Sequence, residues 1–335
     1  MNYKELSHEN AKSFRLSGVD KSFVNALRRT LIGNIPILVL KPEHCVITVN
    51  TTRFTNEIIK SRLACVPVHS MSTIEEYTVE ISEKNDTQGI KYITTEHFKH
   101  NAKTVLFPTY KNRGLDNRVH NEPIEFLRLR KGEELVLTCK TSVGTANESG
   151  MYNSVGTCAF NCTHDKKASD EEWGKNPLDT SKENWDLLGA KRFVIPNTFD
   201  FVVQTLGVFT NEILLQYAVA ILIAQFTHFK NPTATESPTT IKNCYDVKLT
   251  GDYTLKELTI HLQGDYSIGK MLEYELFKTS PTYVSFFKKH PHDPYGILRI
   301  AYKDATPTVI VDAVNNACDE CIALLHDFAS FIKVD

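Results

Sequence analysis

Apolar residues recur at helical spacing close to the start of the chain. Five residues form one apolar side, namely Phe23, Val24, Ala26, Leu27 and Leu31. Asp20 precedes them, and aspartate is a preferred residue at the start of a helix. Gly33 and Pro36 follow them, and both residue types end helices. The pattern predicts a short amphipathic helix over residues 20–33.

The pattern then alternates between strand-like and helix-like segments. Clusters of β-branched residues predict strands over 37–40 and 45–50, and a helix is predicted over 55–63. From about 71 to 185 short alternating segments are separated by polar, glycine-containing loops, which indicates an inserted β-rich domain. Within it, residues 165–185 contain few apolar residues and predict a solvated loop.

A strand over 193–206 leads into the most apolar window of the chain, residues 213–226. This window is shorter than the roughly 20 residues that a membrane-spanning helix needs. It predicts a helix buried in protein, and no membrane contact is expected. Residues 230–240 then contain two prolines and almost nothing apolar, the composition of a linker.

The segment after the linker predicts a compact α+β unit. Strands are expected over 245–249, 254–262, 283–287 and 297–302, and helices over 268–278 and 307–332. One face of the last helix carries Val314, Ala317, Cys318, Cys321, Leu324, Leu325, Phe328 and Ile332. Neither side of the linker has enough structure to cover its own long apolar helix, so we expect the two sides to cover each other.

Charge and cysteine usage narrow the possible functions. The 335 residues include 38 Lys and Arg against 40 Asp and Glu, a formal net charge of -2, so contact with DNA is expected only indirectly. The first residues have no apolar stretch typical of a secretory signal, and an intracellular protein is expected. The eight cysteines are spread over the chain, which favours free thiols over a disulfide framework.

Candidate chemistry within the chain is sparse. Cys158, Cys162 and His164 have nearly the spacing of a zinc site, but the predicted insert supplies only one further cysteine, Cys139. Buried structural cysteines are therefore favoured, and neither a metal nor another cofactor is expected. The chain has no phosphate-binding glycine loop with a following lysine and no nucleophile elbow.

Three segments in order resemble the α-like subunit of multisubunit RNA polymerases, the family of bacterial α, archaeal D and the third subunit of eukaryotic polymerase II. They are residues 16–36, which include LSGVDKSFVNALRRTL; residues 50–68, which include NEIIKSRLACVPV; and residues 199–207, FDFVVQTLG. The segment after the linker is similar to the family's smaller partner, archaeal L or the eleventh subunit of polymerase II. There the resemblance rests on residues 264–272, 284–287 and 291–294.

The resemblance implies a particular fold. It implies an α+β chain of two α-like dimerisation units that form an intramolecular pseudo-dimer. The first unit would comprise residues 1–70 and 186–229, with a β-rich domain of residues 71–185 inserted. A linker of residues 230–244 would lead to the smaller unit, residues 245–335. No homodimer is expected.

The resemblance also implies the function. Adjacent charges such as Arg28 and Arg29 usually lie on a solvated helix face, but in the family this arginine pair contacts the second-largest polymerase subunit. Asn25, Glu57 and Arg62 are further candidate partner-binding residues. The chain would be a non-catalytic assembly platform for the largest, second-largest and small subunits of a DNA-directed RNA polymerase.

A single fused chain resembles polymerases of large DNA viruses, so the expected location is a viral factory in the host cytoplasm or the host nucleus, with packaging in the virion. Two other functions stay open from the sequence. One is a stand-alone β-rich binding protein, and the other is a cysteine–histidine hydrolase built from Cys158 and His164.

Overall fold

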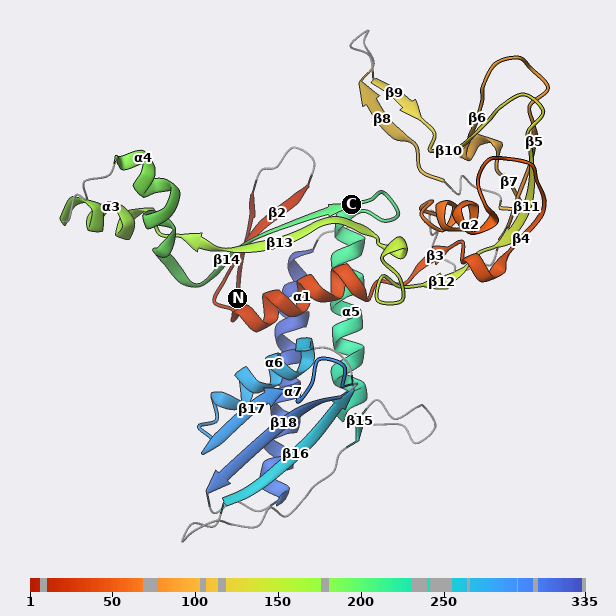
Figure 1. Ribbon diagram of the computed structural model, residues 1–335. Coiled ribbons are helices and arrows are strands. Elements are labelled where there is room, and N and C mark those ends of the chain that lie inside the picture. Colours follow the sequence, from red (N-terminus) through yellow and green to blue (C-terminus); the bar gives the residue numbers. More distant parts are fainter. Residues whose placement is uncertain are drawn as a thin grey trace. The chain divides into compact units, whose positions relative to one another are not determined.

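The computed structural model describes most of the chain (Figure 1). The described residues are 1–6, 11–68, 77–102, 107–113, 119–175, 181–230, 240–241, 255–263, 266–293, 295–303 and 307–332. They fall into two compact units. The first comprises Met1–Leu31, Thr157–Gln204 and Leu215–Asp335, and the second comprises Ile32–Gly156 and Thr205–Leu214.

A four-stranded sheet begins the first unit. Its strands lie in the order β1 (Asn2–Leu6), β2 (Lys12–Ser17), β14 (Val194–Thr205) and β13 (Val155–His164). Residues alternate between the two faces of a strand, so Phe14 and Leu16 of β2 are buried while Arg15 points to the other face. Arg15 lies opposite Asp200 of β14 and donates two hydrogen bonds to its carboxylate, at 2.6 and 3.0 Å.

Helix α1 (Lys21–Gly33) follows β2, and its position confirms the helix predicted over 20–33. Asp20 accepts a hydrogen bond from the backbone N–H of Ser22 at 2.7 Å, which confirms it as the capping residue. The predicted apolar side is buried in full. Because that side faces the core, the polar residues Asn25, Arg28 and Arg29 are held at its margin, where they are partly exposed.

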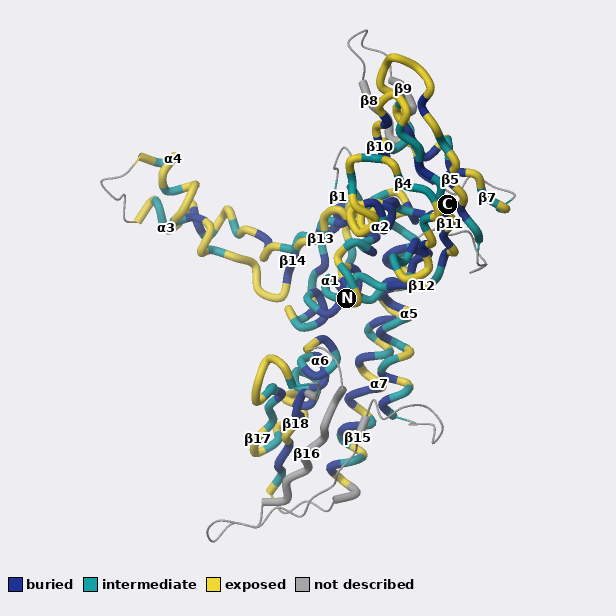
Figure 2. Tube along the Cα trace, turned by 45° about the vertical axis from the view of Figure 1, so that its right-hand side comes forward, coloured by how far each residue is buried: buried dark blue, intermediate teal, exposed yellow. Residues whose placement is uncertain are grey.

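Two long helices complete this unit, α5 (Asn211–Lys230) and α7 (Pro307–Phe331). In α7 the predicted stripe is buried apart from Leu324, which is partly exposed; Ile332, also partly exposed, lies one residue beyond the end of the helix. Figure 2 shows buried and exposed positions alternating along both helices. Lys230 at the end of α5 forms an ion pair with Asp319 of α7.

Aromatic rings join α7 to the first residues of the chain. The ring of Phe328 lies 5.8 Å from that of Phe14 in β2 and 5.8 Å from that of Phe23 in α1. Tyr3 of β1 stacks on Phe331 at 5.6 Å. The C-terminal helix therefore covers a core face made by the N-terminal strands and by α1.

The sequence predicted an apolar helix too short to cross a membrane, and this prediction is wrong for the length of α5. The helix has 20 residues and is apolar enough to cross a membrane by length and composition, a test that a buried core helix also passes. The helix extends beyond the predicted 213–226 at both ends, and at its start the hydroxyl oxygen of Thr210 accepts a hydrogen bond from the backbone N–H of Ile213 at 3.3 Å. One side of α5 is buried at helical spacing, including Leu214, Ala218 and Leu222, which supports its assignment as a core helix.

The C-terminal part of the first unit contains a second four-stranded antiparallel sheet. Its order is β15 (Thr240–Ile241), β16 (Leu255–Gln263), β18 (Tyr295–Lys303) and β17 (Tyr283–Phe287). Helix α6 (Tyr266–Phe277) packs on it around the buried ring of Phe286. A Cβ atom at Gly269 or Gly296 would collide with that ring, so both positions require glycine.

The predicted linker contains the strand β15, which pairs with β16. Lys230, its first residue, is the last residue of α5. The other linker residues, as well as the strand predicted over 245–249, lie outside the described residues.

The second unit is rich in short strands. One sheet has the order β4 (Cys45–Asn50), β11 (Glu134–Lys140), β5 (Thr78–Lys84) and β7 (Lys99–His100). Three further pairs are β10 (Glu125–Leu129) with β6 (Lys91–Thr94), β12 (Ser142–Gly144) with β3 (Ile37–Val39), and β8 (Tyr110–Arg113) with β9 (Val119–Glu122). Helix α2 (Asn56–Ala64) packs on the core.

Short single-turn helices connect elements in both units. They are the 3-10 turns Pro42–His44, Thr95–His97, Gly150–Tyr152 and Ala190–Arg192, and the π-helical turn Trp185–Gly189.

The compact second unit does not coincide with the insert predicted over 71–185. Ile59 and Leu63 of α2 share one hydrophobic core with Leu135 and Leu137 of β11, so the segment before residue 71 belongs to the same compact unit. At the other end, β13 belongs to the sheet of the first unit because it lies beside β14. The predicted boundaries at residues 71 and 185 rest on the change in strand pattern along the sequence. A core shared by residues far apart in the sequence leaves no mark in that pattern.

The solvated loop predicted over 165–185 is wrong for its described part. Helix α3 (Lys166–Lys175) and the short α4 (Lys182–Asn184) form there, between β13 and β14 (Figure 1). Asp165 accepts a hydrogen bond from the backbone N–H of Ala168 at 3.0 Å and begins α3. The ring of Trp173 in α3 lies 5.6 Å from that of Trp185, the residue directly after α4, and this contact connects α3 to the end of α4.

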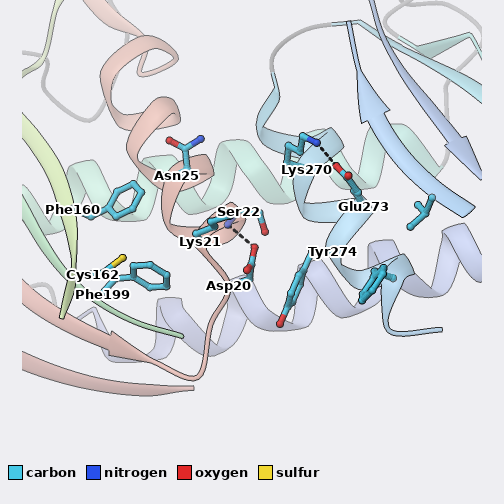
Figure 3. A pocket seen from close by; sticks show the side chains of 12 residues that line it. Asp20, Lys21, Ser22, Asn25, Phe160, Cys162, Phe199, Lys270, Glu273 and Tyr274 are labelled. Carbon is cyan, nitrogen blue, oxygen red and sulfur yellow. Dashed lines mark hydrogen bonds and ion pairs between the residues drawn. The ribbon is translucent and has the colours of Figure 1, made fainter. Parts of the chain in front are cut away.

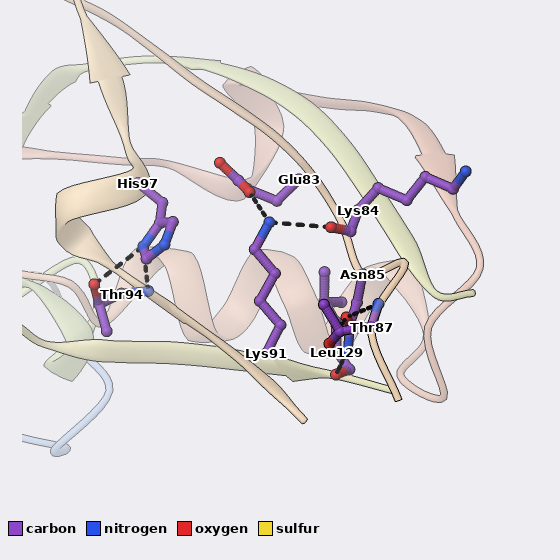
Figure 4. Close-up of polar contacts among 8 residues, drawn as sticks. All are labelled: Glu83, Lys84, Asn85, Thr87, Lys91, Thr94, His97 and Leu129. Atoms are coloured by element: carbon purple, nitrogen blue, oxygen red, sulfur yellow. Dashed lines mark hydrogen bonds and ion pairs between the residues drawn. The ribbon is translucent and has the colours of Figure 1, made fainter. Parts of the chain in front are cut away.

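A buried asparagine organises the loops of the second unit (Figure 4). Asn85 is fully buried and its side chain donates to the carbonyl oxygens of Gly89 and Leu129, each at 2.8 Å. Its carbonyl oxygen accepts from the backbone N–H of Thr87 at 2.9 Å and from its hydroxyl at 2.7 Å. All polar atoms of this buried amide are thus paired, which is the condition for burying it without a penalty.

We expect Asn85→Ala to lower the free energy of unfolding by about 2 kcal/mol, because it removes four hydrogen bonds and leaves the buried carbonyl group of Leu129 without the Asn85 donor. Urea unfolding of the full chain measures the effect. Asn161→Ala, at an exposed position of β13, is the matched control and is expected to leave the midpoint unchanged. Equal midpoints for the two variants would show that the Asn85 network does not stabilise the unit.

Candidate partner-binding surface

The polar margin of α1 holds three of the residues predicted to bind a partner. The side chain of Asn25 accepts two hydrogen bonds from the Arg28 guanidinium, from Nε at 3.2 Å and from Nη2 at 2.9 Å. One turn of helix separates the two residues, the spacing at which side chains on one face meet. Asn25 therefore braces Arg28, while Arg29 lies partly exposed next to it.

This arrangement leaves the charge of Arg28 available to a partner. The amide oxygen of Asn25 is neutral, so it orients the guanidinium without cancelling its charge. A guanidinium presents five donors in a planar fork that matches a carboxylate. Within the described part of the chain no carboxylate forms an ion pair with Arg28.

Glu57 and Arg62 lie on α2, in the second compact unit. They do not pair with each other within the described residues. Five residues apart, they are rotated by about 140° around the helix. Hydrogen bonds from its own backbone N–H and from the Thr55 hydroxyl lower the pKa of Glu57. Arg62 donates from Nε to the carbonyl oxygen of Phe126 at 2.9 Å.

The surroundings of Arg62 include a smaller hollow of about 330 Å³ between α2 and the segment around Glu125. The pKa of the Glu125 carboxyl is lowered, first by its hydrogen bond with Arg128 and further by the charge of Arg62. Arg62 is thus partly engaged within its own unit. Whether it also contacts a partner stays a prediction.

A larger cavity of about 720 Å³ lies beside the start of α1 (Figure 3). Side chains from α1, β13, β14, α6 and β17 line it, and Asn25 is one of them. The other lining residues were not predicted as functional. They come from segments far apart in the sequence, and no spacing pattern connects them.

Cys158 and His164 of β13 do not form a catalytic pair. Cys158 donates through its Sγ to the carbonyl oxygen of Arg28 at 3.8 Å, while His164 Nε2 lies 3.0 Å from the carbonyl oxygen of Ala190. Six strand residues separate the two by about 20 Å. A nucleophile and its base need hydrogen-bond distance, so the hydrolase alternative has no site here.

The described residues also contain no group of three or more histidine, cysteine or acidic side chains placed to hold a metal ion. Cys318 and Cys321 are buried in the apolar stripe of α7, as predicted. Burial raises the pKa of Cys158 to about 12, which keeps this thiol protonated at neutral pH. Metal ligation needs the thiolate.

Comparison with known proteins assigns the family. Residues 13–226, more than half of the chain, match the RNA polymerase Rpb3/Rpb11 dimerisation domain. The chain therefore belongs to the RNA polymerase Rpb3/Rpb11 dimerisation-domain family. The match contains α1, with Asn25, Arg28 and Arg29, as well as Glu57 and Arg62.

Individual relatives are distant in sequence. The chain is 24% identical over 257 residues to DNA-directed RNA polymerase subunit Rpo3 of Pyrococcus furiosus, which covers 66% of this chain and 92% of that protein. It is 32% identical over 184 residues to subunit RPAC1 of DNA-directed RNA polymerases I and III of Bos taurus, and 24% identical over 184 residues to that of Homo sapiens. In both mammalian cases 45% of this chain and 51% of the relative are covered.

We expect Cys162 to react with iodoacetamide at pH 8 about 100-fold faster than Cys158. Cys162 is exposed, whereas at a pKa of about 12 only about one Cys158 thiol in 10,000 is ionised at that pH. Mass spectrometry of peptides from the full chain gives both rates. Because pH 8 and pH 9 both lie below the pKa of Cys158, its rate should rise about tenfold between them. Equal rates for the two cysteines at pH 8 would contradict the desolvation of Cys158, which is half-buried.

Proposed function

We propose that this protein is a non-catalytic assembly-platform subunit of a DNA-directed RNA polymerase. The observation that carries the proposal is the family match over residues 13–226, which contains the braced arginine of α1. The two large catalytic subunits assemble on the platform, and the chemistry of RNA synthesis belongs to them. No comparable observation supports the alternative function, a stand-alone β-rich binding protein.

The proposal includes an intramolecular pseudo-dimer. Its first dimerisation unit comprises residues 1–70 and 186–229 with the insert 71–185, and residues 245–335 form the smaller unit after the linker 230–244. The contacts of Phe328 with Phe14 and Phe23 support it, because they bury apolar surface that each part would otherwise expose. Since the chain supplies both units, no homodimer is needed.

The proposed partners are the largest and second-largest polymerase subunits, with small subunits beside them. The Arg28 guanidinium, oriented by Asn25 and without a carboxylate partner within the described residues, supports docking of the second-largest subunit on α1. The net charge of -2 supports contact with DNA only through the complex. The fusion of both units in one chain is the basis for proposing a viral polymerase, which would act in a viral factory or the host nucleus and be packaged in the virion.

Replacing Arg28 and Arg29 together by alanine should leave the chain folded and reduce its assembly with the second-largest subunit at least about tenfold. The pair lies outside the buried side of α1, whereas an arginine anchor at an interface contributes about 2 kcal/mol or more. Pull-down of co-expressed large subunits by the tagged chain measures assembly, and thermal unfolding reports folding.

The matched control is Lys166→Ala with Lys167→Ala, an adjacent and exposed basic pair on α3. It should assemble like the unchanged chain. Full assembly of the Arg28 and Arg29 variant would show that α1 is not the docking face. Loss of its cooperative unfolding would show instead that the arginines are structural.

A further inference from the structure

The cavity beside α1 adjoins the proposed docking surface. Asn25 lines the cavity and also holds the guanidinium of Arg28. A polypeptide that contacts Arg28 is therefore within reach of the cavity. Figure 3 shows α1 on one side of it and α6 on the other, so an occupant contacts both of the proposed dimerisation units.

The walls of the cavity are aromatic and partly exposed to solvent. Phe160, Phe199 and Tyr274 contribute rings, and the ring of Phe277 is 70% exposed. Large apolar side chains exposed in a hollow are typical of protein-interaction sites. The volume of about 720 Å³ falls within the range of roughly 300–1,000 Å³ found for pockets that hold ligands.

The charges at the rim favour an acidic occupant. The carboxylate of Asp20 caps α1, and that of Glu273 pairs with Lys270. Lys21 is exposed, and among the described residues neither Lys21 nor Arg28 forms an ion pair with a carboxylate. The acidic groups at the cavity are thus engaged within the chain, while two cations are left to a partner.

We propose that the cavity receives an apolar or aromatic anchor side chain, next to a carboxylate, from the polymerase subunit that docks on α1. The inference rests on the proposed function and adds to it a defined binding site for the anchor. We call this cavity the socket. The anchor packs against Phe277 and Tyr274, and the neighbouring carboxylate pairs with Lys21 or Arg28. Anchors of this kind, buried in a pocket and surrounded by polar contacts, dominate the binding energy of many interfaces.

Two substitutions in the full chain test the socket. Phe277→Asp places a carboxylate in the apolar cavity at an exposed position, and Lys21→Glu reverses a rim charge. Each should reduce recovery of the second-largest subunit in a pull-down about tenfold or more. The controls are Ile90→Asp and Lys131→Glu, both at exposed positions of the second unit, and both should assemble fully.

The thiol of Cys162 gives a second readout that does not disturb the socket. It is exposed and lines the cavity, so an anchor should protect it from maleimide. We expect its labelling to slow at least about tenfold when the chain is in the complex. A Lys131→Cys reference thiol on the same chain should keep its rate.

The outcomes separate this inference from the proposed function. If the unchanged chain assembles but Phe277→Asp assembles equally well and Cys162 stays reactive in the complex, the socket is overturned and the assembly function stands. If the unchanged chain recovers no large subunit, both are overturned. Loss of assembly by Phe277→Asp together with protection of Cys162 supports both.

Discussion

The ring of Phe328 joins the end of the chain to its beginning, and much of the first unit depends on that contact. Phe14 of β2 and Phe23 of α1 both pack against it. Burying a phenylalanine side chain contributes about 1.5–3 kcal/mol, and these three rings are all buried. Without α7, the apolar face formed by β2 and α1 would lie open to water.

The same core determines which residues of α1 are available to a partner. Because Phe23, Val24 and Leu27 face the core, Asn25 and Arg28 are directed away from it. Asn25 then holds the guanidinium by two hydrogen bonds, which reduces the entropy that Arg28 loses on binding. The same packing brings the start of α1 to the cavity that α6 lines on its other side (Figure 3). The core packing of α1, the partly exposed position of Arg28 and the cavity beside α1 are thus consequences of one arrangement.

Local patterns predicted the elements whose own residues encode them. The strands β4 and β17 have the predicted bounds, and the buried stripe of α7 follows directly from its helical spacing. Helix α3 was missed because it lacks an apolar stripe, and it depends instead on the Asp165 cap and on the contact of Trp173 with Trp185. Contacts between residues far apart in the sequence carry no local signal. For that reason the shared core of α2 and β11, as well as the cavity lined by five elements, could be found only in the structure.

The most direct test of this account is to divide the chain within residues 235–239 and to co-express fragments 1–234 and 240–335 with an affinity tag on one of them. If α7 completes the core of the N-terminal part, the fragments should co-purify in a one-to-one ratio without a covalent link, and Phe328→Asp should separate them. Two soluble fragments that are folded by circular dichroism, yet migrate as independent monomers at tens of micromolar, would contradict the intramolecular pseudo-dimer.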